Sequence, residues 1–133
     1  MGGSAAAPAV TKFEHMYPGQ PEAIARVRDD VRSFLSGNPA VSDAVLVCSE
    51  LSANAATHSE SAGDFFIVKI ESHAHYVFIE IEDGGGYWPP QAGDDVYPHG
   101  LQLVELLTGG ADGWGIDGDM TSRTVWARLL VAQ

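Results

Sequence analysis

Glu50-Leu51-Ser52-Ala53-Asn54 lies in the middle of a segment, residues 41–58, whose apolar side chains recur at helical spacing. One stripe of this segment is apolar and consists of Ala44, Cys48, Leu51 and Ala55. Along its flank, Glu50, Asn54 and His58 follow one another at i+4 steps. We therefore expect a helix that carries a carboxylate, an amide and an imidazole beside a buried face. Polar groups in that position cost stability unless they are partnered, and the alternative interpretation is an ordinary amphipathic edge.

The residues before this helix predict one strand and one further helix. A weak strand signal covers residues 10–16, and Pro18-Gly19 marks a turn. Pro21 suits the first position of a helix that continues to Leu35, and Ser36-Gly37 ends it. Asn38-Pro39 is a suitable cap for the helix over residues 41–58.

The period changes to two after Asp64, which predicts a hairpin with strands over residues 66–71 and 76–82. Asp83 continues the parity of the apolar residues in the second strand, so its carboxylate is expected to point to the side covered by helices. Gly84-Gly85-Gly86 follows and permits positive φ or the close approach of a flat ligand. Taken alone, Asp83 and its glycines also fit a simple turn.

The last third of the chain predicts a loop, a short helix and two strands. Residues 87–99 carry no periodicity, and Gly100 opens a helix that stops at Thr108-Gly109-Gly110. Strands are expected over residues 114–117 and 121–131. The order of elements predicts an α+β fold, a two-layer α/β sandwich with a mixed, mostly antiparallel sheet and helices on one face. We expect a disordered tail over residues 1–10 and one domain over residues 11–133.

Composition narrows the classes of partner and compartment. The chain has 133 residues, with 18 Asp+Glu against 7 Lys+Arg and a formal charge of −11, which disfavours nucleic acid and anionic membranes and favours a basic protein surface. A lone cysteine, Cys48, cannot form a disulfide within the chain. The sequence has neither a long apolar run nor the basic start of a signal peptide, so a cytoplasmic setting is expected. His73 and His75 are interpreted as solvated turn residues and not as a metal pair.

Three motifs in one order resemble the GHKL superfamily, whose ATP-binding domain is called the Bergerat fold. Glu50-x-x-x-Asn54 corresponds to its N box, Asp83-Gly84-Gly85-Gly86 to its first glycine box, and Gly100-Leu101-Gln102-Leu103-Val104 to its second. Within that superfamily, the block from Ser49 to Ala55 and the closing strand from Arg123 to Ala127 are similar to anti-sigma factor serine kinases. The resemblance extends from about residue 20 to residue 131.

The resemblance implies a role for each matching residue, with ATP and Mg²⁺ as cofactors. Asn54 would ligate Mg²⁺, and Glu50 would be the general base toward a serine hydroxyl. Asp83 would accept a hydrogen bond from the adenine amino group. The remaining residues of the binding site would be Gly85 under the base, Gly100 and Leu101 at the phosphates, His58 and Arg123 as positive groups near phosphate, and Thr124 near the nucleotide floor.

The resemblance further implies a kinase that binds a sigma factor, phosphorylates a serine on an antagonist protein and pairs as a homodimer. Pro98 stands two residues before Gly100, where the family usually has glycine, and proline fixes φ and removes an N–H donor. This departure favours a second hypothesis, a protein-binding module with the same fold that transfers no phosphate. A detached histidine-kinase ATPase domain is disfavoured, because no dimerisation helix with a phosphoacceptor histidine precedes the domain.

Overall fold

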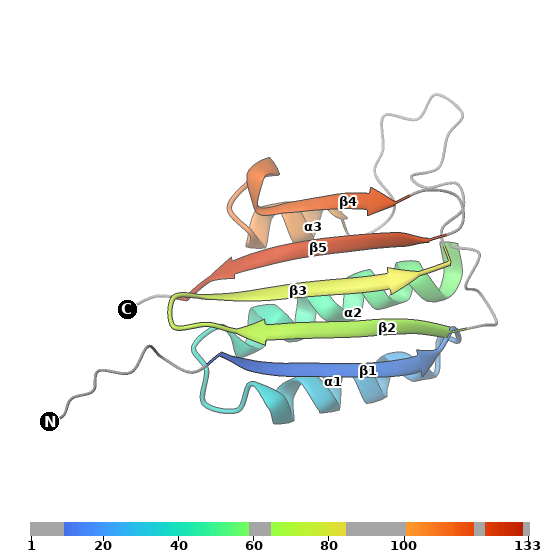
Figure 1. Cartoon of the computed structure of the whole chain (residues 1–133), viewed down its shortest axis with the longest axis horizontal. Coiled ribbons are helices and arrows are strands. Elements are labelled where there is room, and N and C mark those ends of the chain that lie inside the picture. Colours follow the sequence, from blue (N-terminus) through green and yellow to red (C-terminus); the bar gives the residue numbers. More distant parts are fainter. Residues whose placement is uncertain (1–9, 59–64, 85–100, 119–121, 132–133) are drawn as a thin grey trace, which may run out of the picture.

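The computed structural model describes residues 10–58, 65–84, 101–118 and 122–131. They form three α-helices, one short 3-10 helix and five strands (Figure 1). In chain order the elements are β1 (Thr11–Pro18), α1 (Ala23–Phe34), α2 (Val41–His58), β2 (Phe65–Ser72), β3 (Tyr76–Asp83), α3 (Leu101–Leu107), η1 (Ala111–Gly113), β4 (Trp114–Gly118) and β5 (Arg123–Leu130).

The strands form one open sheet in the order β1-β2-β3-β5-β4, and each of these four pairings is antiparallel. The expected α+β class is therefore confirmed, whereas the expectation of a mixed sheet is wrong for the described strands. Local periodicity identifies strands but does not fix which distant strand pairs with which, and this is why the direction of the β3–β5 pairing was not predicted.

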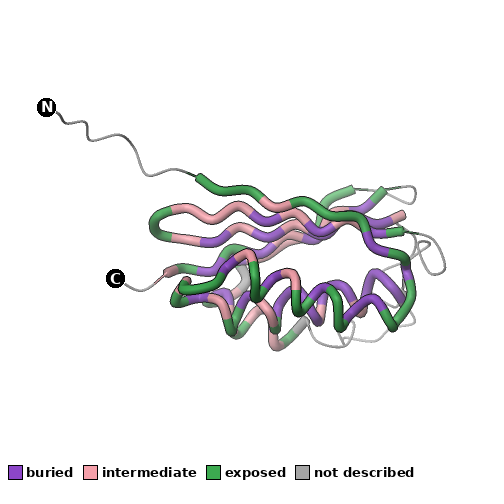
Figure 2. The backbone as a smooth tube through the Cα atoms, turned by 90° about the horizontal axis from the view of Figure 1, so that it is seen from below, coloured by how far each residue is buried: buried purple, intermediate pink, exposed green. Residues whose placement is uncertain are grey.

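The helices cover one face of the sheet (Figure 2). The strands alternate accordingly: in β3 and β5 the odd-numbered residues are buried on the covered face, and in β2 the even-numbered ones are. This arrangement is compatible with a two-layer sandwich. None of the helices in the described part of the chain is long and apolar enough to cross a membrane.

Helix α2 lies at the centre of the molecule and packs against α1, β2, β3 and β5. Its predicted apolar stripe is buried, since Ala44, Cys48, Leu51 and Ala55 are each at most 2% exposed. Burial in these apolar surroundings raises the pKa of the Cys48 thiol to about 12. The helix begins where the sequence predicts, because the Asn38 side-chain oxygen accepts a hydrogen bond from the Ala40 amide at 2.8 Å.

Strand β1 lies at the open edge of the sheet and is tied to α1. The Tyr17 hydroxyl donates a hydrogen bond to the Asp30 carboxylate at 2.7 Å. Burial, and then this bond, raises the pKa of Tyr17 above its usual range. The strand is longer than expected and reaches Pro18, which an edge strand tolerates because one side of its backbone needs no partner.

Helix α3 ends at the three residues predicted to stop it. Gly109 and Gly110 both have positive φ, and the Gly110 amide donates to the Glu105 carbonyl at 2.9 Å. The Trp114 indole then donates to the Glu105 carboxylate at 3.1 Å, which joins α3 to the start of β4.

The β2–β3 hairpin turns at His73–His75, as predicted, with the His73 amide bonded to the Tyr76 carbonyl at 2.9 Å. The His73 ring lies 2.9 Å from the Glu71 carboxylate and stacks on Tyr76. The expected tail, residues 1–10, lies outside the described residues except for Val10.

Candidate functional site

Three elements meet at one end of the sheet. Strand β3 ends there with Asp83, and β5 begins there with Arg123. Helix α2 packs against both strands, and its carboxyl-terminal end lies at the same end of the molecule (Figure 1). Asp83 and the carboxyl-terminal end of α2 therefore lie at the same end of the molecule (Figure 1). This end is the candidate site.

Asn54 supplies the strongest evidence for a ligand on the α2 side. The residue is only 5% exposed, and its amide nitrogen has no hydrogen-bond partner among the described residues. A buried polar group is normally partnered, and leaving a donor unpaired costs about 1–3 kcal/mol. Glu50, one turn earlier on the same helix, is half-buried.

Asp83 points to the covered side, as its parity predicted, and is only 6% exposed. Arg123 lies directly opposite in the β3–β5 register. The Arg123 Nη2 donates to the Asp83 Oδ2 at 2.9 Å, and the exposed fractions of the two side chains are 4% and 2%. The carboxylate expected to recognise adenine is thus engaged in a buried ion pair. Arg123, which the resemblance places near the phosphates, is the donor in this pair.

Thr124 lies on the other face of the sheet. It is neighbour to Arg123 in an alternating strand, and its partners across the sheet are Glu82 and Asp117. Side chains of successive strand residues point to opposite faces, so Thr124 does not share a face with Asp83. The structure therefore does not place its hydroxyl at the floor of a site on the covered side.

Several predicted site residues fall at or beyond the limits of the described chain. Gly85, Gly100 and Pro98 lie outside the described residues. His58 is the last residue of α2, and Leu101 is the first residue of α3. For both residues the structure describes the backbone only.

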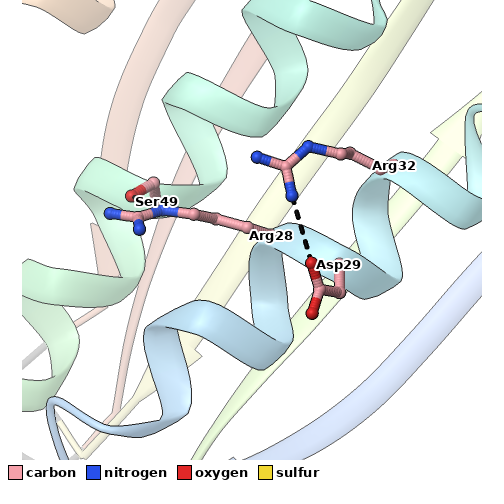
Figure 3. Close-up of polar contacts among 4 residues, drawn as sticks. All are labelled: Arg28, Asp29, Arg32 and Ser49. Carbon is pink, nitrogen blue, oxygen red and sulfur yellow. Dashed lines mark hydrogen bonds and ion pairs between the residues drawn. The ribbon is translucent and has the colours of Figure 1, made fainter.

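A contact between the two long helices supports the Glu50 turn of α2. Arg28 reaches from α1 toward α2, and its Nε donates to the Ser49 hydroxyl at 3.0 Å (Figure 3). Arg32, one turn further along α1, pairs with Asp29 at 3.1 Å. Sequence reasoning missed the Arg28 contact, because nothing in the local pattern relates a charged residue of α1 to a serine of α2.

The described residues fit Mg²⁺-ATP in part. An asparagine oxygen is a suitable ligand for Mg²⁺, which keeps several waters and takes further oxygens from phosphates, and the unpartnered amide nitrogen of Asn54 suits a phosphate oxygen. Within the described ranges no three His, Cys, Asp or Glu side chains gather into a group that could hold a metal ion. Asp83 does not fit adenine while it is paired with Arg123.

Comparison with known proteins adds no family assignment. No protein-family model matches the sequence, and no curated protein matches it.

Proposed function

We propose that this protein is a Bergerat-fold ATP-binding regulator of the anti-sigma factor type. It binds Mg²⁺-ATP, phosphorylates a serine on an antagonist protein and sequesters a sigma factor. The observation that carries the proposal is the buried amide of Asn54, whose nitrogen has no partner among the described residues. Asn54 stands on the last turns of α2 and Asp83 completes β3, in the order of motifs that the GHKL resemblance implies.

Each residue at this end has a role that its position supports. Asn54 holds Mg²⁺ through its side-chain oxygen and orients the phosphates through its nitrogen. Glu50, one turn away and half-buried, accepts the proton of the attacking serine hydroxyl with its carboxylate. Arg28 holds the neighbouring Ser49 and so steadies this turn of α2. Bound Mg²⁺-ATP would supply the γ-phosphoryl group to the serine oxygen, and ADP would leave.

The charge of the chain supports a protein partner with basic residues. A formal charge of −11 attracts a basic segment of a sigma factor and speeds the encounter, while it repels the phosphates of DNA. The sigma factor therefore meets this protein directly, with no nucleic acid between them. A homodimer and a cytoplasmic setting belong to the same proposal.

A second candidate function is a protein-binding module that transfers no phosphate. The buried pair of Asp83 and Arg123 favours it, because it occupies the carboxylate that adenine recognition requires. Pro98 in the second glycine box favours it as well.

A transfer assay separates the two candidates. The protein is incubated with γ-labelled ATP, Mg²⁺ and purified antagonist-type proteins, and label on a serine is measured. We expect transfer by the wild type, and a loss of about 10²–10⁴-fold in Glu50→Gln if Glu50 is the base. Glu80→Gln is the matched control, since Glu80 lies on the uncovered face of β3 and its loss should leave transfer unchanged. Undiminished transfer by Glu50→Gln would contradict the assigned base, and ATP binding without transfer to any antagonist would favour the module.

A further inference from the structure

The ion pair between Asp83 and Arg123 is the most deeply buried pair of opposite charges in the described part of the chain. It joins the last residue of β3 to the first residue of β5 across directly paired positions. With side chains 2% and 4% exposed, neither charge is accessible to solvent. While the pair is closed, the Arg123 guanidinium occupies Oδ2 of Asp83 and helps to cover the carboxylate from a ligand.

The guanidinium of Arg123 and the amino group of an adenine base would both use the Asp83 carboxylate as a hydrogen-bond acceptor. Both donate N–H groups to a carboxylate oxygen, and the Arg123 Nη2 already donates to Oδ2 at 2.9 Å. The charge-assisted bond from arginine is stronger than a bond from the neutral amino group of a purine. Direct competition between the two therefore favours the closed pair.

We propose that Arg123 is an internal competitor for Asp83 that keeps the base-recognising carboxylate closed and thereby weakens adenine nucleotide binding. This inference rests on the proposed function. Apparent affinity falls in proportion to the fraction of molecules whose site is open. A pair that is open in about 1–10% of molecules weakens binding about 10–100-fold.

Calorimetric titration of the full chain with Mg²⁺-ATP tests this inference. Arg123→Thr removes the competitor and keeps a residue that suits a strand, so we expect at least about tenfold tighter ATP binding than in the wild type. The gain should vanish in the double variant Arg123→Thr/Asp83→Asn. It should also be absent with Mg²⁺-ITP, whose base carries an oxo group in place of the amino group. Arg128→Thr is the matched control, because Arg128 is an exposed arginine of the same strand on the opposite face.

Loss of Arg123 removes the positive charge that faces the buried Asp83 carboxylate, which costs stability, so circular dichroism must accompany each titration. If Arg123→Thr does not fold, Arg123→Lys decides the question, since it keeps the positive charge but loses the planar fork. We then expect tighter binding by about threefold or more. A folded variant that binds ATP no tighter than the wild type would overturn the inference and leave the proposed function intact. Failure of the wild type and every Arg123 variant to bind ATP would overturn both.

Discussion

Replacing Asn54 by alanine should stabilise the ligand-free protein. The substitution removes a buried amide nitrogen that has no partner among the described residues, which relieves a cost of about 1–3 kcal/mol. Alanine is also the better helix former, by about 0.6 kcal/mol, while the lost packing of the larger side chain costs about 1 kcal/mol. The net gain should be on the order of 1–2 kcal/mol, which raises Tm by about 3–8 °C for a chain of this length.

Asn38→Ala is the matched control for this measurement. The Asn38 side chain accepts a bond from the Ala40 amide at 2.8 Å and donates one to the Ser72 hydroxyl at 3.4 Å, so its loss should cost about 1 kcal/mol. Thermal and urea unfolding of both variants and the wild type, without nucleotide, give the two differences. If Asn54→Ala lowers stability as Asn38→Ala does, then the Asn54 amide is a structural group and not one retained for a ligand.

Three further predictions concern the core and the ion pair. Asp83→Asn should lower the free energy of unfolding by about 3–5 kcal/mol, because it removes the negative charge that pairs with the buried Arg123 guanidinium, and little loss in urea unfolding would contradict a stabilising pair. Since the pKa of Cys48 is raised to about 12 from 9.0, the unfolded chain releases the thiol proton first, and stability should fall by about 1.4 kcal/mol per pH unit above pH 9. Urea unfolding of Cys48→Ala at pH 8 to 10 should show a smaller fall of stability with pH than the wild type. The same fall in both proteins would contradict the raised pKa of Cys48. Gly113→Ala should cost more than about 1 kcal/mol, because its new carbon would lie 2.3 Å from the Thr108 carbonyl oxygen, and wild-type Tm in this variant would refute the close approach.

Much of the fold follows from patterns within single segments. Helix α2 has the predicted ends, Val41 and His58, because a long apolar stripe and the Asn38 cap act together. The β2–β3 hairpin follows from alternation, and so does the inward direction of Asp83. Helix α1 begins at Ala23 and not at Pro21, because Pro21 takes part in the preceding turn, in which its carbonyl accepts a bond from the Ile24 amide at 3.1 Å.

The partner of Asp83 was not predicted, although the sequence does indicate on which face of β5 Arg123 lies. Val125, Ala127 and Leu129 alternate on the buried face of β5, and the same parity places Arg123 on that face and Thr124 on the other. The sequence does not reveal the register between β3 and β5, because Asp83 and Arg123 are separated by 40 positions along the chain. A register over that separation is set by the packing of the whole sheet and not by any local motif.

If α2 and β3 form one nucleotide site, Mg²⁺-ATP should perturb both elements together, and an NMR titration tests this most directly. Mg²⁺-ATP is added to ¹⁵N-labelled protein, and the backbone amide signals together with the Asn54 side-chain signal are followed. We predict that the signals around Asn54 and those around Asp83 shift together and saturate with a single Kd, while the signal of Trp126 on the uncovered face stays in place. Shifts at only one of the two segments, or none at saturating Mg²⁺-ATP, would contradict the claim.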